Sequence, residues 1–541
     1  MNVIITLAGH SRRFTEAGYQ TPKFLIEIDG RPMIEHVVEM YSVSNDTFYF
    51  VLNNVQNDTY PELADRLMEI VQWGRVVVIK EHELGPVHTA MSVAEMIEDD
   101  EPVIISYCDM FVEWNYTSFK NEIISYDAAI PCFIGFQPAS YGVTKYAYVR
   151  VDENMEMLEL REKECFTDNR VDEYASAGIY YFKSWKLFMD TATTLMDIGF
   201  GGLKEGYVSL LTNIMINQGC KIKITRIDKF ICWGTPEDVS HYHFWSLYFL
   251  QNQFKKMSEL SAEHHHTSQI NVVPMAGRGT RYKKALYNIS KPLVLIGHEP
   301  MFLKASHSFP SGDQWVFLFR ADNLKKHRVL KTLVQDNFQN ANIVAVEHET
   351  SGQAATCLMA KEHLPLGFSL FIASCDYMTI YDHKKWKELM SKPEVDVVVW
   401  TYRMGSMLTK DPESFAYCKV GDDGITLTEI VEKETISDTP NKDPLLVGTF
   451  WFRDSSDFVD SAEHAIKNNI HVNGEHYIGN SLNKLIQEGK NVVLFDVDQW
   501  ISFSDPFELD VYYFWDDFFH RRYGSLKEFD KLAIAEKDTI T

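Results

Sequence analysis

Short apolar runs recur along this chain and are separated by amphipathic segments. The first five runs are IITLAG, FYFVLNN, RVVVIKE, PVIISYCD and DAAIPCFIGF. Continuous apolar runs of this length are typical of strands that are buried on both faces. Between the first two runs, PMIEHVVEMY has the spacing of a helix. Strands that alternate with helices predict an α/β fold, in which a mostly parallel sheet is flanked by helices.

The second half of the sequence repeats the first. The strand-like runs return as VVPMAG, WVFLFRA, NIVAVEHE, FSLFIASCD and VDVVVWTY. Five matched pairs keep their order at almost constant spacing: Gly9 and Gly277, Lys23 and Lys291, Asp109 and Asp376, Glu205 and Glu475, Trp245 and Trp515. We therefore predict two homologous domains, residues 1–250 and 270–541, the second ending in a helical tail. A polar linker is expected at 251–269.

Composition and charge exclude several classes of function. The chain is 45% hydrophobic and 24% charged, which is ordinary for a soluble globular protein. Its net charge of -24 argues against partners such as nucleic acid or an anionic membrane, although local lysines and arginines can still hold a small phosphorylated ligand. We see no signal peptide and no transmembrane run, and we expect a cytoplasmic location. Eight scattered cysteines without a CxxC pair argue against zinc and disulfides.

A glycine-containing turn follows the first predicted strand of each half, where α/β sheets bind ligands. The turns read AGHSRRF and AGRGTRY. Their small residues let the backbone approach a phosphate and aim N–H groups at it. These candidates are Ala8 and Gly9 in the first half, and Ala276, Gly277, Gly279 and Thr280 in the second. Neither turn is a dinucleotide fingerprint or a P-loop, and an ordinary strand-to-helix turn is the competing interpretation.

Charged residues accompany both turns. Asp109 and Asp376 each end an apolar run, where a carboxylate suits Mg²⁺; the alternative is an aspartate that caps a turn. Lys163 and Lys433 lie in acidic surroundings, so they pair either with a phosphate or with neighbouring surface carboxylates.

Taken together, LAGHSRRF, TPKFL, the aspartate at the strand end, the Glu-Lys pair and CWGTPED resemble one family, the nucleoside-diphosphate-sugar pyrophosphorylases. In the second half, GRGTRY and SKPL carry the resemblance, which covers nearly all of both halves. It implies two tandem Rossmann-like nucleotidyltransferase domains, each with a mostly parallel sheet flanked by helices. It also implies the Mg²⁺-dependent reaction of an NTP with a sugar phosphate to give an NDP-sugar and pyrophosphate.

The resemblance also assigns roles to matching residues. Arg13, Lys23, Arg281 and Lys291 would bind the triphosphate and stabilise its charge. Asp109 and Asp376 would bind Mg²⁺, and Lys163 and Lys433 would hold the acceptor phosphate. Gly85 and Gly352 fall in segments that resemble the base-recognition loop. Gly178, Glu205, Gly448 and Glu475 fall in segments that resemble the sugar-binding site.

Both halves depart from the family pattern. Ser11 replaces the second glycine of the first phosphate loop, and FSDPFE replaces WGTPED in the second half. The position of a second metal-binding aspartate is taken by Cys232 and Ser502. Asp228 and Asp498 are the candidate substitutes.

Several hypotheses about the function are compatible with the sequence. The tandem, capsule-type members of the family favour CTP as the nucleotide, a sugar or polyol phosphate as the acceptor, and synthesis of a capsule or other surface glycan. A glycosyltransferase of related fold is the alternative enzyme, although it would have no use for the arginine and lysine pair. A catalytic half joined to a regulatory or assembly half is a third reading, and a homo-oligomer is compatible with each.

Overall fold

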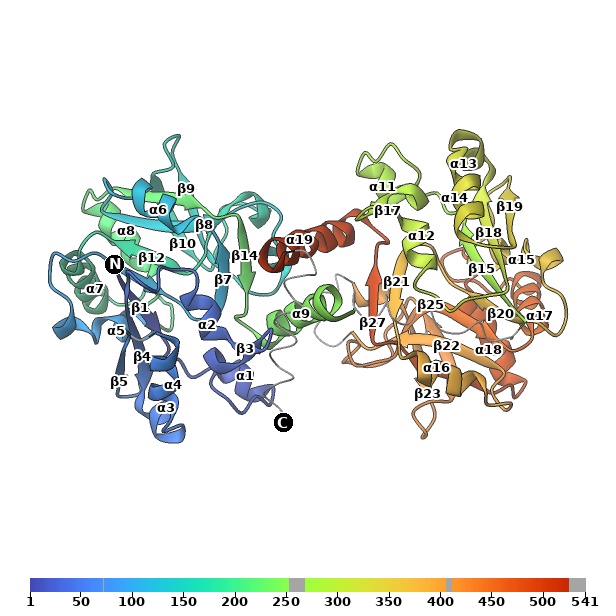
Figure 1. Cartoon of the computed structure of the whole chain (residues 1–541), viewed down its shortest axis with the longest axis horizontal. Helices are drawn as coiled ribbons and strands as arrows, with labels where there is room; N and C mark the ends of the chain where they lie inside the picture. Colours follow the sequence, from blue (N-terminus) through green and yellow to red (C-terminus); the bar gives the residue numbers. More distant parts are fainter. Residues whose placement is uncertain (72, 253–267, 405–410, 525–541) are drawn as a thin grey trace. The chain divides into compact units, whose positions relative to one another are not determined.

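The computed structural model describes residues 1–71, 73–252, 268–404 and 411–524 (Figure 1). The chain divides into two compact units, Met1–Ser246 and Leu247–Thr541. Residues 253–267, which make up most of the expected linker, and residues 525–541 of the expected tail lie outside the described residues.

The first strand of the first unit lies inside its sheet, between two parallel neighbours. Strand β1 (Asn2–Thr6) lies in parallel between β4 (Thr47–Asn53) and β6 (Val103–Ser106), and β5 (Arg75–Ile79) pairs in parallel with β4. Beyond β6 the pairing becomes antiparallel through β12 (Ile179–Phe182), β8 (Ala128–Phe133), β11 (Tyr174–Ser176), β9 (Ala147–Val151) and β10 (Met157–Glu162). Strand β13 (Ile222–Arg226) pairs in parallel with β8. The short pairs β2 (Glu27–Ile28) with β3 (Arg31–Pro32), and β7 (Met110–Glu113) with β14 (Lys229–Cys232), lie off this sheet.

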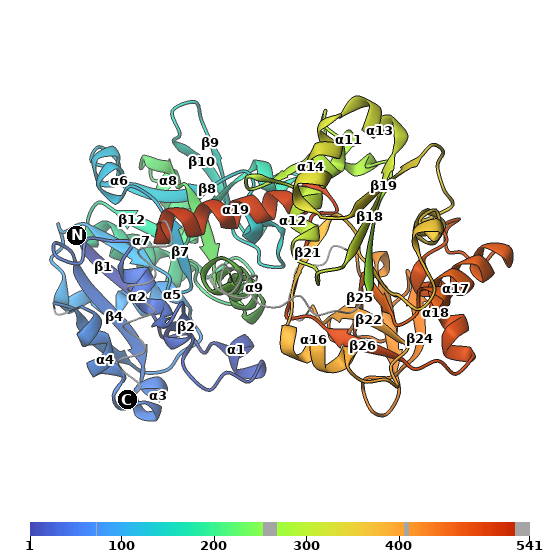
Figure 2. The same cartoon turned by 45° about the vertical axis from the view of Figure 1, so that its right-hand side comes forward.

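Helices follow most of these strands. In the first unit they are α1 (Arg12–Glu16), α2 (Met33–Val38), α3 (Asn54–Thr59), α4 (Leu63–Ile70), α5 (Pro86–Met91), α6 (Tyr116–Glu122), α7 (Trp185–Ile198), α8 (Ser209–Asn217) and α9 (Pro236–Ser246). Helices α5, α7 and α8 bury their apolar sides against one face of the sheet, where Val87, Phe188 and Leu211 join Ile4 and Ile105 in the main core (Figure 2).

The second unit repeats this order of strands. Its sheet runs β19 (Ala341–Val346), β18 (Gln314–Arg320), β15 (Gln269–Met275), β20 (Ser369–Ile372), β25 (Leu445–Phe452), β22 (Val397–Tyr402) and β26 (Val492–Asp496), which matches β5-β4-β1-β6-β12-β8-β13. Strand β23 (Ala416–Val420) extends it and pairs with β24 (Leu427–Glu432). The off-sheet pairs are β16 (Leu295–Ile296) with β17 (Glu299–Pro300), and β21 (Tyr377–Ile380) with β27 (Gln499–Ser502).

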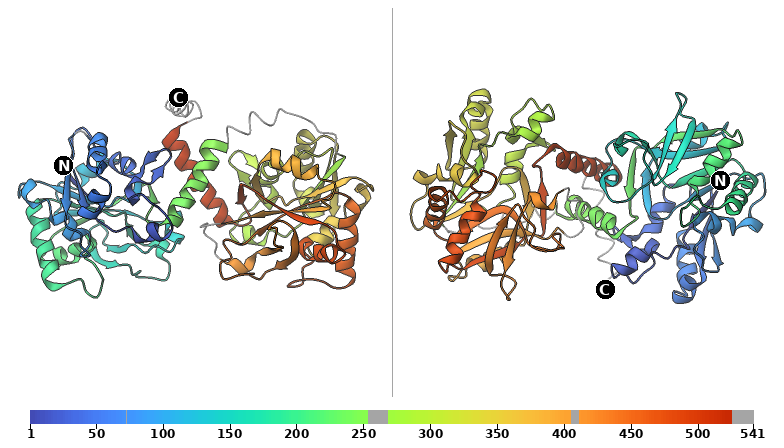
Figure 3. Two further views of the ribbon diagram at one scale, coloured as in Figure 1. Left: turned by 90° about the horizontal axis from the view of Figure 1, so that it is seen from below. Right: turned by 180° about the vertical axis from the view of Figure 1, so that it is seen from behind.

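The helices of the second unit are α11 (Thr280–Lys284), α12 (Met301–Ser306), α13 (Ala321–Lys326), α14 (Val329–Asn337), α15 (Gln353–Leu358), α16 (His383–Met390), α17 (Ser455–Lys467), α18 (Ile478–Gln487) and α19 (Pro506–Tyr523), besides the π-helix η5 (Leu247–Asn252). The layering of each unit can be followed in Figure 3. No helix among the described residues is long and apolar enough to cross a membrane.

The predicted α/β class is confirmed, and the sheet adds a feature that the sequence pattern did not reveal. The strands next to β1 and β15 are parallel, so the loops that follow them share one edge of the sheet. Strands β12 and β25 run antiparallel to β6 and β20. They therefore bring the segments around Gly178 and Gly448, which precede or interrupt them, to that same edge.

An asparagine covers the open backbone of an edge strand in each unit. Asn213 on α8 accepts a hydrogen bond from the Leu160 amide at 3.0 Å and donates one to the Leu160 carbonyl at 2.8 Å. Asn483 on α18 makes the same two bonds to Ile430, at 2.8 and 2.9 Å. A side-chain amide is the group that can satisfy an N–H and a C=O together.

The substitution Asn213→Leu should expose the Leu160 amide to solvent exchange. Losing two partly buried hydrogen bonds costs about 1–3 kcal/mol, so we expect that amide to exchange roughly 10- to 100-fold faster. Hydrogen exchange followed by mass spectrometry checks this. The Ile430 amide is the internal control in the same sample, and equal acceleration at both sites would contradict the assignment.

Candidate active site

The phosphate loops of the two units have the same backbone shape despite their different residues. Ser11 has φ 51° and ψ 31°, and Gly279 has φ 60° and ψ 38°, so both lie in the left-handed region. Glycine enters this region freely, whereas a residue with a Cβ does so at a cost of about 1–2 kcal/mol. The space beside Gly9 and Gly277 is open to 4 Å, so a phosphate can approach both backbones.

A glycine also fixes each segment that resembles a base-recognition loop. Gly85 has φ 93°, and a Cβ there would lie 2.8 Å from the Gly206 nitrogen. Gly352 has φ 134°, and its Cβ would lie 2.5 Å from the His476 nitrogen. Only glycine fits such contacts with backbone. The structure thus brings the expected base loops against the segments that contain Glu205 and Glu475.

Arginines bridge the phosphate loop and the base loop. Arg12 pairs with Glu83 in the first unit, and Arg278 pairs with Glu349 in the second. All four side chains are more than half exposed, so these pairs contribute little to stability. Each pair still holds an arginine between the phosphate loop and the expected base loop.

A lysine and an aspartate pair at the centre of each site. Lys23 contacts Asp109, and the Lys291 Nζ lies 2.6 Å from an Asp376 oxygen. Burial would lower the pKa of each lysine, but the neighbouring carboxylate outweighs burial and raises it. Likewise, burial would raise the pKa of Asp376, and Lys291 holds it below its ordinary value. Both members of the pair in the second unit are therefore charged.

The arginines expected to act beside these lysines take different positions. Arg281 donates to the Ser504 hydroxyl at 3.2 Å, and Lys291 donates to the Ser504 carbonyl at 3.1 Å. The structure thus brings Arg281 and Lys291 together on the FSDPFE loop. In the first unit, the charge of Arg13 reaches Tyr207, where it opposes the rise in pKa that burial and Glu205 cause.

The expected acceptor lysines share an unusual backbone. Lys163 and Lys433 both have φ 60°, although neither is glycine. Strained residues that persist at matched places often belong to functional sites. The Lys163 ammonium lies 4.1 Å from the centre of the Tyr207 ring and donates to its hydroxyl, which in turn donates to Glu205 at 2.6 Å.

Tyr207 joins two residues that the sequence singled out, but sequence analysis missed the tyrosine itself. The signal was present, because Tyr207 and Tyr477 hold the same place in EGY and EHY. In the second unit, Lys433 lies 5.6 Å from the Tyr477 ring, and its ammonium donates to the Ser414 carbonyl. The glycines expected nearby, Gly178 and Gly448, have φ 80° and 89°.

The structure does not bring the candidate aspartates Asp228 and Asp498 to the metal site. Strand β14 runs antiparallel to β7, with Cys232 opposite Met110 and Lys229 opposite Glu113, so Asp228 lies at the far end of the ladder from Asp109. Asp498 likewise donates its backbone N–H to Ile380, at the far end of the β21–β27 pair from Asp376.

A different carboxylate faces Asp109. A Cβ added to Gly234 would lie 3.6 Å from an Asp109 oxygen and 3.7 Å from an Asp238 oxygen, so both line the space beside this glycine. Burial raises the pKa of Asp238, and the charge of Asp109 raises it further. In the second unit Ser504 occupies the Gly234 position, and Glu508 accepts from its hydroxyl at 2.8 Å.

These residues fit a magnesium ion that is shared with a substrate. No group of three or more His, Cys, Asp or Glu side chains within the described ranges could hold a metal alone. Mg²⁺ is usually bound by one or two protein carboxylates, with substrate phosphates and waters as its other ligands. Asp109 and Asp238 supply that number of carboxylates beside an open phosphate loop.

Comparison with known proteins identifies the first unit. Residues 3–133 match the model of the family described as the MobA-like NTP transferase domain. This part of the first unit is therefore similar to MobA-like NTP transferase domains. The matched range contains the first phosphate loop, Lys23, Gly85 and Asp109. The resemblance of its motifs to the nucleotide-sugar pyrophosphorylases is thereby confirmed.

Curated relatives and solved structures resemble parts of the chain. The bifunctional protein GlmU of Methanococcus maripaludis strain C5 is 26% identical over 180 residues, which is 33% of this chain and 39% of that protein. GlmU of Methanocaldococcus jannaschii is 24% identical over 182 residues. The chain thus spans about two fifths of these relatives.

Among solved structures, a nucleoside-diphosphate-sugar pyrophosphorylase from Vibrio cholerae shows 21% identity and a TM-score of 0.38 over 45% of this chain and 98% of its own. The inositol-1-phosphate CTP transferase from T. maritima shows 15% identity and a TM-score of 0.35 over 45% of this chain and 93% of its own.

Exchanging residues between the two phosphate loops should change the stability of the two units in opposite directions. Ser11→Gly should stabilise the first unit by about 1 kcal/mol, because it removes the Cβ from a left-handed position. Gly279→Ser should destabilise the second unit by at least as much, since its Cβ would also lie 3.3 Å from the Lys291 Cβ. Thermal unfolding of the two variants checks the signs, and changes of the same sign would contradict the shared conformation.

The glutamates before the acceptor lysines should titrate differently. Ser209 donates to Glu162 and partly offsets the burial that raises its pKa, whereas Gly479 holds the matching place beside Glu432. Burial raises the pKa of Glu432 to about 7. Protonation of Glu432 therefore stabilises the fold. That contribution is complete below pH of about 4 and is lost as the pH rises through about 7.

Replacing Ser209 with glycine should shift the pKa of Glu162 upward, toward that of Glu432. Side-chain carboxyl NMR over a pH titration measures both groups in one sample, with Glu432 as the internal reference. A Glu162 pKa that does not move would show that the Ser209 hydroxyl has no influence on it.

Proposed function

We propose that this protein is a Mg²⁺-dependent nucleotidyltransferase. It would join an NTP to a sugar or polyol phosphate, forming an NDP-sugar or NDP-polyol and pyrophosphate. The observation that carries the proposal is the partly buried lysine–aspartate pair at the phosphate loop, Lys23 with Asp109, inside the range that matches the NTP transferase family. The same pair recurs as Lys291 and Asp376.

The chemistry needs charge neutralisation and positioning rather than a general base. An oxygen of the acceptor phosphate forms a bond to the α-phosphorus, the bond from that phosphorus to the β-bridging oxygen breaks, and pyrophosphate leaves with the electron pair. Because the acceptor is already an anion, no proton must be removed. Lys23 and Arg13 would stabilise the charge that develops on the α-phosphate and the leaving group.

On the acceptor side, Lys163 would hold the attacking phosphate, while Tyr207 and Glu205 keep its ammonium in place. The backbone beside Gly85 would contact the base. A magnesium ion held by Asp109 with Asp238 would neutralise charge on the triphosphate when bound.

CTP is the nucleotide we propose, and synthesis of a capsule or another surface glycan is the role. Both follow from the resemblance of the tandem motifs to capsule-type members of the family. A polyol phosphate and a hexose phosphate would use the same contacts to Lys163, since those contacts recognise the phosphate group.

Pyrophosphate release by the purified chain tests the proposal. CTP, UTP, dTTP, GTP and ATP would each be incubated with Mg²⁺ and a panel of sugar and polyol phosphates. We expect release that requires CTP together with one acceptor. Replacing the arginine that would contact the triphosphate should lower kcat/KM about 10²- to 10³-fold in each unit that is active. Arg13→Ala and Arg281→Ala therefore show which unit carries the activity.

Lys186→Ala, on an exposed turn of α7 where Lys186 pairs with Asp190, is the matched control and should leave the rate unchanged. No release with any pair of substrates would contradict nucleotidyl transfer. Release that neither arginine variant affects would contradict the assigned site.

A further inference from the structure

The two units present opposite charges on equivalent helices. In the first unit, α3 and α4 follow β4 and carry a net acidic face, which comprises the exposed residues Asp58, Glu62, Asp65 and Glu69 together with the exposed Arg66. In the second unit, α13 and α14 follow β18 and carry a basic face, which comprises the exposed residues Lys325, Lys326, Arg328 and Lys331. Figure 2 shows each pair of helices on the flank of its own sheet.

The basic charge is available to a partner. Among the described residues no ion pair engages Lys326, Arg328 or Lys331, and Lys325 approaches Glu347 only at 4.0 Å. A cluster of this kind is unexpected in a chain whose net charge is -24. Because a uniform negative charge would keep copies of the chain apart, the basic face is the place where an acidic surface meets the least repulsion.

An exposed leucine lies beside the basic face. Leu286, just after α11, is 86% exposed and has φ 62°. The matching position of the first unit holds Gly18, which takes φ 91° without strain. The loop that carries Leu286 is tied to α13, since Lys326 donates to the Asn288 carbonyl at 3.4 Å. Leucine in a strained, exposed position has no structural role within its own unit.

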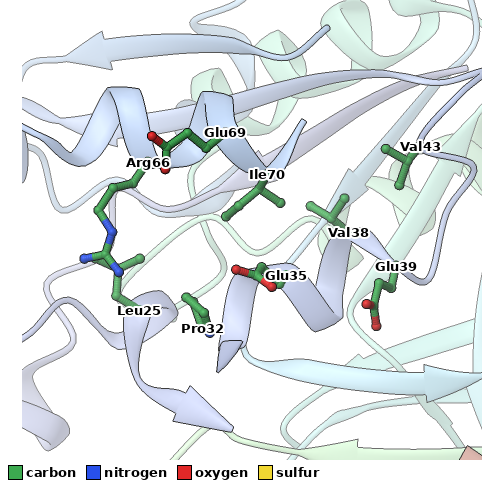
Figure 4. Close-up of a pocket in the computed structure, with 9 residues that line it drawn as sticks. All are labelled: Leu25, Pro32, Glu35, Val38, Glu39, Val43, Arg66, Glu69 and Ile70. Atoms are coloured by element: carbon green, nitrogen blue, oxygen red, sulfur yellow. The ribbon is translucent and has the colours of Figure 1, made fainter. Parts of the chain in front are cut away.

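The acidic face borders a pocket of about 470 Å³ that has a mixed polar and apolar lining (Figure 4). Leu25, Val38 and Ile70 provide apolar side chains, Glu35, Glu39 and Glu69 provide carboxylates, and Arg66 provides a guanidinium. Glu39 is itself paired with Arg31. In the second unit, α14 ends at Phe338, whose ring lies 5.5 Å from His307, the counterpart of Glu39. The first unit has the smaller Val71 at the end of α4, which leaves room for the pocket.

We infer that the basic face of one chain binds the acidic face of a second copy, with Leu286 entering the pocket between α2 and α4. The two faces carry opposite net charge, and Leu25, Val38 and Ile70 offer apolar side chains that Leu286 can contact. The contact joins two different surfaces, so it is heterologous, and each copy keeps one free face for a further copy. This inference is independent of the proposed enzymatic activity.

Sedimentation velocity of the full chain tests the association. We expect concentration-dependent assembly at low salt that weakens at least tenfold at high salt, because exposed charges are screened. Lys325→Glu with Lys326→Glu makes both faces acidic, and Glu62→Lys with Glu69→Lys makes both faces basic. Each variant alone should be monomeric, and an equimolar mixture of the two should assemble again.

Two further variants separate the contact from general charge effects. Lys186→Glu with Lys467→Glu changes the net charge as much as the first variant but lies on α7 and α17, so it should assemble like the unchanged chain. Leu286→Gly should weaken assembly severalfold without lowering the melting temperature, since glycine relieves the strained backbone.

A chain that stays monomeric at low salt would overturn the inference. So would assembly that survives either charge reversal, or a mixture of the two variants that fails to assemble. If the lysine reversal weakens CTP binding but leaves assembly intact, the basic face would instead attract the nucleotide, which also overturns the inference.

Discussion

A partly buried ion pair between a lysine and an aspartate organises both sites. Lys23 arrives from the end of the phosphate loop and Asp109 from the end of β6, so the pair fixes two loops of the sheet edge against each other. Removing one partner from such a pair would leave a partly buried charge without compensation, which destabilises the fold. The pair therefore places a cationic and a carboxylate group side by side in each site. A triphosphate would be attracted to the lysine of this pair, and a cation would be attracted to the aspartate.

The arrangement of the other loops follows from this edge. Glycine at 85 lets the expected base loop contact the backbone of the segment that carries Glu205, and glycine at 352 does the same for the segment that carries Glu475. The expected base and acceptor segments are therefore adjacent in each unit. The antiparallel strand next to β6 or β20 returns the chain to the same edge with Gly178 or Gly448. Each site thus collects residues that lie far apart in sequence, because neighbouring strands end there.

Sequence analysis predicted the parts of the site that repeat at fixed spacing. The phosphate loop, Lys23, Asp109, Lys163 and Gly85 are each marked twice, and the structure gathers them into one region in each unit. What it could not predict depends on register and backbone angle. Asp228 matched its repeat well, yet the antiparallel pairing of β14 with β7 carries it away from Asp109. Asp238 lies nearer to Asp109, because the turn at Gly234 brings both carboxylates to the same space.

Duplication explains which positions stayed alike and which diverged. The loop that follows the first strand of each unit keeps its conformation although the residue changes, because Ser11 takes the angles of Gly279. Positions on the outer helices carry no such constraint, and there the net charge has reversed between the segment that contains α3 and α4 and the segment that contains α13 and α14. A single-unit protein cannot present two surfaces of opposite charge on the same scaffold position. A tandem one can, because each unit keeps its own sheet edge intact while its outer helices change independently.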